Sequence, residues 1–540
     1  MKLKKNSFLE GAYIATACIF ISKILGIIYV IPFYRIIGEQ GGALYGYAYN
    51  IYNVFYTVSS AGIPFAICKL TSEYGALGLE DKKIRMYRLS TVLIYIFSLI
   101  SFLVCFCFSR PIAQLIIGDI KGGNSMQDVV FVIRCISFTL LIVPLLSIKR
   151  GYLQGHKYIS QPSISQVVEQ LARIIIILVG SATVLYLTSS VRNAVGISVL
   201  AAGLGGLISF LYLSRVVRNN REELGLNRRV KSTRAEDKQI LNEIVICALP
   251  FIVINLANTL YTSTDMILVL KTLPKLGFSA SETEFVSSVF TTWGTKFNAI
   301  ITAVSTGLIV SLIPHIVSDY TAGKKEEVNA NFNKTLKIIL LIITPLSCFV
   351  SLMADSFWTV FYSPNKIGYS IIRVTIIITI FDCLYMVMNS LTQSLNKKRI
   401  VFVSVLAGLI TNLILDIPLM HLFSYLGLSA YYGAIAATFC GFLLSNTLSL
   451  VYLHKNLSLH LGETLHSIPR ALISLAAMIV AGLLLRMILP IESSSKLIQL
   501  FNIAVSGIIC AGIYLALNFR AILSVLPPKL LKKLHISISQ

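Results

Sequence analysis

Residues 397–422 of the chain, KKRIVFVSVLAGLITNLILDIPLMHL, decide what kind of protein the sequence encodes. Three basic residues, Lys397, Lys398 and Arg399, precede a run of about 20 residues that are almost all apolar. The run lacks the two-residue alternation that a strand of a membrane barrel needs. It therefore predicts a helix long enough to cross a bilayer, with a basic flank at its start.

Runs of this kind recur along the whole chain. Of its 540 residues 56% are apolar and only 13% are charged, and the mean hydropathy is +0.78. A water-soluble chain of this length exposes far more charge, so the main solvent is lipid. The predicted fold class is all-α integral membrane, with about fourteen transmembrane helices. The predicted spans are residues 8–37, 43–70, 88–108, 128–152, 161–187, 194–215, 243–270, 286–317, 336–361, 370–395, 400–422, 430–453, 468–489 and 498–519.

Lysine and arginine are unevenly shared between successive loops. With these spans, the loops on one side hold roughly 31 of these residues and the loops on the other side roughly 7. Cytoplasmic loops are the basic ones, so both termini are predicted to be cytoplasmic. The same placement explains the net charge of +22 without nucleic acid as a partner. The first apolar stretch is too long for a signal-peptide core, so no cleaved signal is expected.

The two halves of the chain share a motif at an offset of about 245 residues. It comprises Asn53, Thr57, Ser60 and Gly62 in the first half and Asn298, Thr302, Ser305 and Gly307 in the second. A repeat that keeps its orientation predicts two lobes related by an axis along the membrane normal, with the substrate site between them. The predicted parts are a six-helix lobe at 1–214, a basic cytoplasmic linker at 215–240, a second six-helix lobe at 241–455, and two additional helices with a cytoplasmic tail at 456–540.

Charged residues deep inside the predicted spans are the strongest sign of function. Each costs about 2.5–3.5 kcal/mol near a helix centre on insertion scales, so each should face protein or a wet cavity. Lys23, Arg173 and Lys296 are of this kind, and they predict a site for an anionic diphosphate headgroup. The alternative is that they only form ion pairs, with Glu169 or Asp382.

Charged residues near the ends of predicted spans need no functional explanation. Arg35, Lys69 and Arg486 lie at such positions. Their aliphatic stems can lie along apolar surface while the charged group reaches the interface. These three residues are therefore expected to snorkel.

A second group of polar residues is acidic. Asn412 and Asp416 are four residues apart on one span, so their side chains project from one helix face. Thr438 and Asp265 lie on two other spans of the same predicted lobe. Carboxylate, amide and hydroxyl oxygens are hard ligands that suit a sodium ion or a proton relay. The alternative is ordinary hydrogen bonding between helices.

No motif of the sequence indicates an enzyme. It has no glycine–lysine loop for a nucleotide phosphate, and no histidine or cysteine pairs with an evident base. The ten cysteines are scattered singly, which predicts neither disulfides nor a zinc site. Transport would therefore be driven by an ion gradient or by a separate subunit.

Three motifs of the first half point to a family: residues 22–26 (SKILG), 62–67 (GIPFAI) and 151–155 (GYLQG). They resemble the MurJ/YtgP group of lipid II flippases, and the related stage V sporulation protein B and polysaccharide biosynthesis sequences, in the MATE-like (MOP) exporter superfamily. The resemblance implies two six-helix lobes plus two C-terminal helices. It also implies movement of lipid II, the undecaprenyl-diphosphate-linked peptidoglycan precursor, from the inner to the outer leaflet of the bacterial cell membrane by alternating access.

The resemblance assigns roles to single residues. The family usually has arginine where Lys23 stands, and it tends to carry a basic residue at the position of Lys296. Tyr29 replaces a second arginine of the Gram-negative members, so the cleft is expected to be less cationic here. The family's sodium site corresponds to Asp265, Asn412, Asp416 and Thr438, with Ala434 supplying a backbone carbonyl.

Three alternative functions stay open at this point. A drug or cation antiporter of the same fold would favour acidic and aromatic residues over Lys23 and Lys296, because its substrates are cationic. An exporter of another lipid-linked oligosaccharide, of the teichoic acid, capsule or O-antigen type, would bind the same diphosphate. A scaffold of the cell-wall assembly would give the internal charges no role. The expected partners are the lipid-linked oligosaccharide, membrane lipids and cell-wall synthesis proteins, and the expected state is a monomer.

Overall fold

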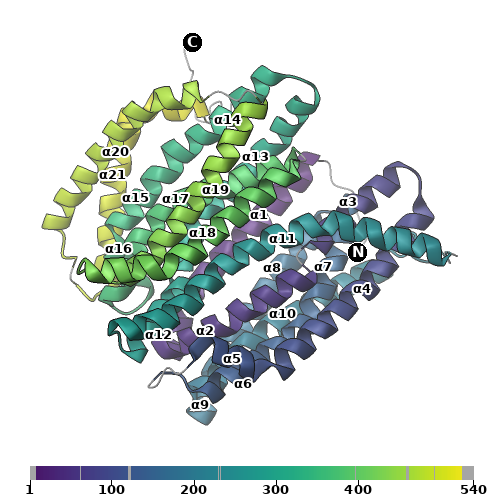
Figure 1. The fold of residues 1–540 in the computed structure, drawn as a ribbon, viewed down its shortest axis with the longest axis horizontal. Helices are drawn as coiled ribbons and strands as arrows, with labels where there is room; N and C mark the ends of the chain where they lie inside the picture. The colour runs from purple at the N-terminus through teal and green to yellow at the C-terminus, as the bar shows by residue number, and fades with distance from the viewer. Residues whose placement is uncertain are drawn as a thin grey trace. The chain divides into compact units, whose positions relative to one another are not determined.

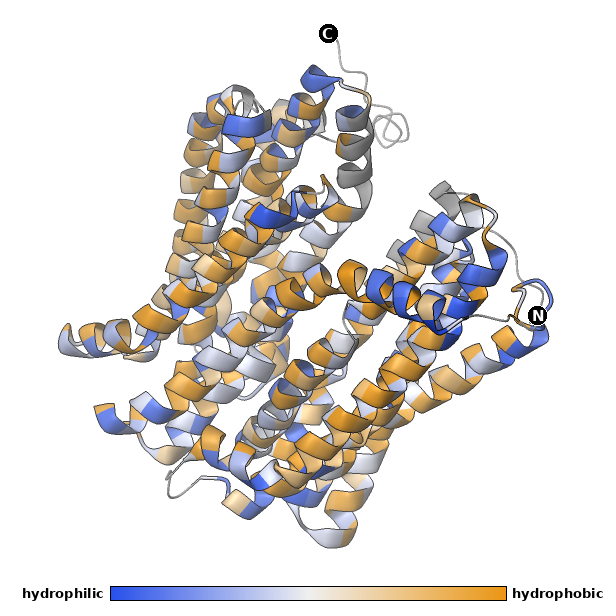
Figure 2. Cartoon of the chain, turned by 45° about the vertical axis from the view of Figure 1, so that its right-hand side comes forward, coloured by the Kyte–Doolittle hydropathy of each residue, from blue (hydrophilic) through white to orange (hydrophobic). Residues whose placement is uncertain are grey.

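The computed structural model describes residues 8–60, 62–118, 123–228, 230, 233–395, 397–457, 461–491 and 493–525. Over these ranges the secondary structure is helical and contains no strand. Apolar residues dominate the long helices, and hydrophilic residues gather near many of the helix ends (Figure 2). Helices of this kind satisfy every backbone group internally, which is what a bilayer demands.

Twelve helical segments within the described ranges are long and apolar enough to cross a membrane. The chain is therefore a multi-pass, all-α membrane protein, as the composition predicts. The count of fourteen spans stays a prediction.

The chain divides into two compact units, of which the first comprises residues 1–296 and 412–434. Within it, α1 packs along α8, while α10 packs along both α7 and α8 (Figure 1). The helices of this unit before residue 296 are α1 (Phe8–Ile28), α2 (Val30–Ser60), α3 (Ile63–Ala76), α4 (Glu80–Cys107), α5 (Ser109–Ile117), α6 (Met126–Ser137), α7 (Thr139–Gly155), α8 (Ser160–Ile175), η1 (Ile176–Gly180), α9 (Ser181–Thr188), α10 (Val191–Asn219), α11 (Arg234–Thr272), η2 (Leu273–Leu276), α12 (Ala280–Ser288) and η3 (Val289–Trp293).

The second unit comprises residues 297–411 and 435–540. Its last two helices, α20 and α21, run side by side, and α15 packs on α17 (Figure 1). The remaining helices of the chain are α13 (Thr295–Thr321), α14 (Lys325–Ile338), η4 (Ile339–Ile343), α15 (Thr344–Leu352), α16 (Ala354–Phe361), α17 (Lys366–Ser394), α18 (Lys398–Tyr425), α19 (Tyr431–Leu457), α20 (Gly462–Ile488) and α21 (Lys496–Val525). Both α18 and α19 contribute residues to each unit.

The first predicted span, 8–37, is not one continuous helix. Helix α1 ends at Ile28, and α2 starts at Val30 and continues to Ser60. Inside α2, Gly38 has φ 67° and ψ −168°, a conformation that is open to glycine and strained for other residues. The predicted gap between the first two spans, at 38–42, is thus present as a break within α2.

The predicted linker, 215–240, is helical at both ends, because α10 continues to Asn219 and α11 begins at Arg234. A capping box starts α11: Thr233 Oγ1 accepts from the Glu236 amide at 3.3 Å, and the Glu236 carboxylate accepts from the Thr233 amide at 2.8 Å. The first turns of α11 are charged, so apolarity alone does not detect them. The division into lobes and linker stays a prediction.

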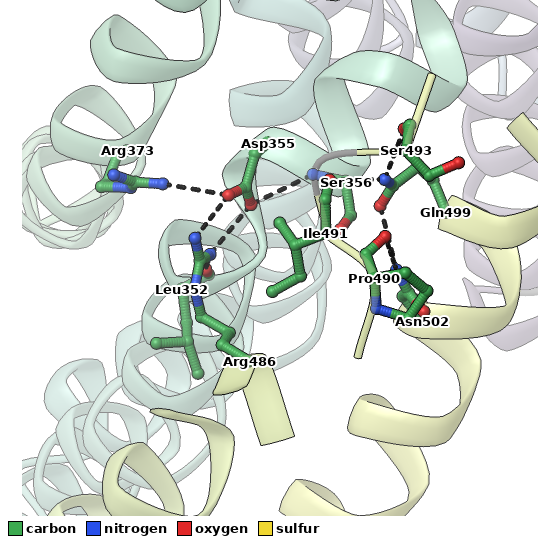
Figure 3. A network of polar contacts seen from close by, with 10 residues as sticks. All are labelled: Leu352, Asp355, Ser356, Arg373, Arg486, Pro490, Ile491, Ser493, Gln499 and Asn502. Carbon is green, nitrogen blue, oxygen red and sulfur yellow. Dashed lines mark hydrogen bonds and ion pairs between the residues drawn. The ribbon is translucent and has the colours of Figure 1, made fainter. Parts of the chain in front are cut away.

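Arg486 does not snorkel, contrary to the expectation from its position near a span end. Its guanidinium donates to Asp355 Oδ1 at 2.9 Å and to the carbonyl of Leu352, so it ties α20 to α15 and α16 (Figure 3). Asp355 also accepts a hydrogen bond from Arg373 at 3.4 Å. The prediction was wrong because Asp355, at the start of α16, supplies a partner close by.

Candidate substrate and cation sites

A row of tyrosines lies along α2. The ring centroids of Tyr45 and Tyr49 are 4.5 Å apart, those of Tyr49 and Tyr52 5.9 Å, and those of Tyr52 and Tyr56 5.6 Å. Spacings of four, three and four residues put these rings on one helix face. The row forms an aromatic surface on which cations can rest.

Two of the predicted headgroup residues are held against tyrosine rings. Cζ of Arg173, on α8, lies 5.0 Å from the centre of the Tyr49 ring. Nζ of Lys296, in the first turn of α13, lies 5.7 Å from the centre of the Tyr29 ring. The two cations are close enough for their charges to interact. Like charges repel in such a setting, so the pair favours an anion as its third member.

No carboxylate in the described ranges forms an ion pair with Arg173 or Lys296. Glu169 pairs instead with Arg150 of α7, whose Nη2 lies 2.7 Å from its Oε2 and whose Nε donates to Ser165 Oγ at 2.8 Å. Nε of Arg173 is buried and has no hydrogen-bond partner in the part of the chain that is described. A buried donor without an acceptor is unfavourable, which again suits an incoming anion.

Lys23 is half-buried on α1, which packs along α8. One turn further along α1, the two helices approach closely, because a Cβ added to Gly26 would lie 3.3 Å from Nε2 of Gln170. Gln170 is one turn before Arg173. The structure therefore brings Arg173 and Lys296 together and places Lys23 on the helix beside Arg173.

Three residues whose side chains form part of the predicted cation site lie in the first unit and are buried: Asp265 on α11, and Asn412 and Asp416 on α18. Nδ2 of Asn412 donates to Oδ1 of Asp265 at 3.0 Å. Both carboxylate oxygens of Asp416 are buried and accept no hydrogen bond from the described residues, and its charge is close enough to that of Asp265 to interact. Two buried carboxylates near each other favour a shared cation or proton.

Gly433 allows α19 to approach α18 next to Ala434, another residue of the predicted cation site. A Cβ added to Gly433 would overlap the backbone of Leu419 and Met420, so α19 meets α18 one turn beyond Asp416. Ala434, the next residue, is fully buried in the first turn of α19. Thr438, one turn later, is half-buried and belongs to the second unit.

These donors suit a cation that binds oxygen. Among the described residues, no group of three or more His, Cys, Asp or Glu side chains could hold a metal ion. Within the first unit, a sodium ion would rely on the carboxylates of Asp265 and Asp416 and on the amide oxygen of Asn412.

Helix α2 also packs tightly against η3, three residues before Lys296. The indole of Trp293 is fully buried and lies over Gly42, where an added Cβ would overlap its ring. One turn along α2, a Cβ on Gly46 would overlap the side chain of Thr291. Two glycines four residues apart are the small-residue spacing that lets helices approach in membranes.

We expect the Gly42→Ala substitution to destabilise the protein by about 1–3 kcal/mol, because the added methyl group overpacks the Trp293 contact. Thermal unfolding in detergent should show a lower Tm. The control is Gly512→Ala on α21, where an added Cβ meets nothing within 4 Å. A smaller ring in the double variant Gly42→Ala/Trp293→Phe should restore part of the loss. An unchanged Tm for Gly42→Ala would contradict the overpacking argument.

Glu284 of α12 links three segments of the first unit. Its Oε1 accepts from the backbone amide of Asn124 at 2.9 Å, and its Oε2 accepts from Nδ2 of Asn124 at 3.0 Å. The same Nδ2 donates to the carbonyl of Gln40 on α2 at 3.0 Å. Burial raises the pKa of the Glu284 carboxyl above its usual range, although the bonds from Asn124 oppose this shift.

This shift predicts how stability changes with pH. A raised pKa means that the folded protein binds the proton of Glu284 more tightly than the unfolded chain does, so its contribution to stability grows as the pH falls through the folded pKa. The Tm of the wild type minus the Tm of Glu284→Gln should therefore increase as the pH is lowered from 8 to 5.

The control for this experiment lies two residues away on the same helix. Hydrogen bonds from Ser279 lower the pKa of Glu282, so its contribution is lost as the pH falls. Because this lowered pKa lies below the usual carboxyl range, the difference in Tm between the wild type and Glu282→Gln should stay nearly constant from pH 8 to pH 5. Parallel curves for the wild type and Glu284→Gln would contradict the assignment.

Sequence reasoning missed several of these residues. Arg150 is the partner of Glu169, and Trp293 and Glu284 fix η3 and α12 against the first part of the chain. The spacing of Gly42 and Gly46 is the one available signal for the tight contact. The tyrosines of α2 gave no sign of a functional role in the sequence, because aromatic residues in a membrane span usually pack against other helices.

Two family models match the chain. The model described as "Polysaccharide biosynthesis protein" matches residues 8–305, and the MatE model matches residues 250–417. Two relatives from Bacillus subtilis (strain 168) are similar in sequence. Lipid II flippase MurJ is 30% identical over 452 residues, which cover 81% of this chain and 82% of the relative. Stage V sporulation protein B is 24% identical and covers 63% of this chain and 64% of that protein.

Solved structures show the same fold. A structure of "Lipid II flippase MurJ, inward closed conformation" superposes with a TM-score of 0.66 at 13% identity, over 93% of this chain and 98% of that one. An inward-facing multidrug resistance MATE family transporter of the MOP superfamily superposes with a TM-score of 0.61 at 14% identity, over 82% and 98%. At these identities the structures inform the fold alone.

Proposed function

Because the chain belongs to the polysaccharide biosynthesis protein family, we propose that it is a lipid II flippase. The family membership also confirms the resemblance that its motifs indicate. It moves the undecaprenyl-diphosphate-linked peptidoglycan precursor from the inner to the outer leaflet by alternating access. Its relatives are transporters rather than enzymes, in keeping with a role that needs no catalytic residue.

The observation that carries the proposal is the pair formed by Arg173 and Lys296. A diphosphate needs fixed cations that replace its hydration while leaving it free to depart. Arg173 offers a planar guanidinium, and Lys296 a compact ammonium, both positioned on tyrosine rings and neither bound to a described carboxylate. Lys23, on the adjoining α1, is the third cation that we assign to the headgroup.

This charge pattern favours the flippase over a drug antiporter. A cationic drug would be repelled by two neighbouring cations, so an antiporter site should hold the opposite charge. The tyrosines could bind a cationic drug by themselves, but here Arg173 and Lys296 already occupy the rings of Tyr49 and Tyr29.

Energy for transport comes, in this proposal, from a sodium ion or a proton at Asp265, Asn412, Asp416, Ala434 and Thr438. A ligand shifts a conformational equilibrium only by binding its states unequally. The donors of this set lie on α11, α18 and α19, so a movement between these helices would change the affinity for the cation.

The cellular setting follows from the same proposal. The protein lies in the bacterial cell membrane with both termini cytoplasmic, since the basic loops and both ends share one side. Two six-helix lobes, 1–214 and 241–455, alternate access to the substrate, and the protein works as a monomer beside cell-wall synthesis proteins.

Complementation of a strain depleted of its own lipid II flippase tests the proposal. The chain should restore growth and should expose lipid II on the outer leaflet, where an externally added lipid II hydrolase can cleave it. Membrane insertion without exposure of lipid II would overturn the assignment. If proteoliposomes then moved another undecaprenyl-diphosphate oligosaccharide and not lipid II, the related exporters would supply the correct substrate class.

A further inference from the structure

The second unit contains a polar cavity that the proposed transport route does not use. It has a volume of about 800 Å³ and lies where α16, α17 and α20 end or begin, beside the segment that joins α20 to α21. Three cations line it, namely Lys366, Arg373 and Arg486, and Asp355 is its one acidic residue among those described. The described lining residues therefore carry an excess of two positive charges.

Asp355 and Arg486 form a clasp that satisfies both residues. Arg486 donates to both oxygens of Asp355 and to the Leu352 carbonyl, and the side chains of Arg486 and Asp355 are only 22% and 13% exposed (Figure 3). A bidentate pair of this kind neutralises itself. The cations that remain available to a ligand are therefore Arg373 and Lys366.

Arg373 and Lys366, unlike Arg486, are not held in a bidentate ion pair with Asp355. Arg373 is 42% exposed, rests on the Tyr369 ring at 5.6 Å, and makes a single long contact of 3.4 Å with Asp355. Lys366 is exposed at the start of α17 and forms no ion pair with any described residue. Asn365 caps α17 by accepting from the amides of Ile367 and Gly368, so the positive end of this helix also faces the cavity.

The surroundings of the cavity are apolar and exposed. Met487 and Ile488 follow Arg486 directly and are 84% and 79% exposed, and Leu497 at the start of α21 is 79% exposed. These residues belong to helices that are long and apolar enough to cross a membrane. The cavity thus joins a cationic lining to a rim that suits hydrocarbon chains, at the level where headgroups lie.

The geometry points to a binding site for the phosphate of a lipid, held by Arg373 and Lys366 while its chains lie against α20 and α21. Two sources share this chemistry: an anionic phospholipid of the membrane, or the diphosphate of an undecaprenyl carrier. The site is separate from Arg173 and Lys296, which lie in the first unit. It stands whether or not the chain is a flippase, since the phospholipid source needs no transport.

Photo-crosslinking in nanodiscs tests this site. The full-length protein carries p-benzoylphenylalanine at Ser493, which lines the cavity, or at the exposed Tyr186 of α9 as a control position. One set of nanodiscs is phosphatidylcholine with a minor fraction of phosphatidylglycerol, and a second set replaces the phosphatidylglycerol with undecaprenyl diphosphate. The readout is the share of each lipid among the adducts relative to its share in the bilayer.

We expect the phosphate lipid to be enriched about 25-fold at Ser493 and not at Tyr186, because each of the two cations adds about a factor of five to the affinity for an anion. The double variant Lys366→Gln/Arg373→Gln should abolish the enrichment, because it removes both cations that we assign to the phosphate. It retains the ion pair between Arg486 and Asp355, so the local fold should be unchanged. Lys275→Gln, an exposed lysine outside the cavity, should leave it unchanged.

The two sets of nanodiscs identify the source. Enrichment of phosphatidylglycerol assigns the site to membrane phospholipid, and enrichment confined to undecaprenyl diphosphate assigns it to the carrier. Loss of enrichment in millimolar inorganic phosphate would support a headgroup contact in either case. Equal enrichment in the wild type and the double variant, or none at Ser493 in both sets, would overturn the proposal.

Discussion

Replacing Lys296 with glutamine should lower the rate of lipid II translocation by at least about 100-fold, which corresponds to about 2.7 kcal/mol of lost stabilisation. Lys296 is one of two neighbouring cations held on tyrosine rings, and removing it leaves Arg173 as the main charge for a diphosphate. Translocation in proteoliposomes, scored by accessibility of lipid II to an added hydrolase, gives the rate. Arg173→Gln should have an effect of similar size.

Conservative variants distinguish binding from folding. Lys296→Arg should retain part of the activity, because arginine keeps the charge and can engage a phosphate with two donors. Lys23→Gln should also impair transport, but less than Lys296→Gln, because Lys23 lies on the neighbouring helix. The control is Lys275→Gln, which alters an exposed lysine of η2. Wild-type translocation by a Lys296→Gln/Arg173→Gln protein would remove the headgroup assignment.

The second large effect is expected at Asp416. Asp416→Asn should lower translocation at least about tenfold and should abolish its dependence on sodium or on a proton gradient. The asparagine keeps the size of the side chain and removes the charge that would bind the cation. Both oxygens of Asp416 are buried, and none of the described residues donates to them, so the charge has no evident structural purpose.

The measurement compares rates with and without a sodium gradient and over a range of pH. Asp81→Asn, an exposed carboxylate in the first turn of α4, is the control and should behave as the wild type. Asp265→Asn should reproduce the loss of cation dependence, because Asp265 shares a hydrogen bond with Asn412. A variant of Asp416 that transported at the normal rate, with normal cation dependence, would show that the cluster is structural.

The helical membrane fold could be predicted because a run of about 20 apolar residues is the length that a helix needs to cross a bilayer. The prediction failed where polar residues form helix, as in the first turns of α11, which depend on the cap at Thr233 rather than on apolarity. It also missed the break between α1, which ends at Ile28, and α2, which starts at Val30, because this break lies within an unbroken apolar run.

The candidate sites were predictable to different degrees. Spacing of four residues placed Asn412 and Asp416 on one face, and the structure adds the contact between Asn412 and Asp265. Sequence could not show that Tyr29 and Tyr49 hold the cations, because these contacts join helices far apart in the chain. Arg486 was misjudged for the same reason, since its partner Asp355 lies 131 residues away.

Both cations of the pair lie about three residues from a π-helical turn, Arg173 before η1 and Lys296 after η3. Such a turn holds about one residue more than an α-helical turn, and each residue rotates an α-helix by about 100°. In a homologue that lacks η3, the residue written beneath Lys296 in a gapless alignment would therefore project from a different face. Comparative searches for the substrate-binding lysine across the family should allow a one-residue gap between residues 289 and 293.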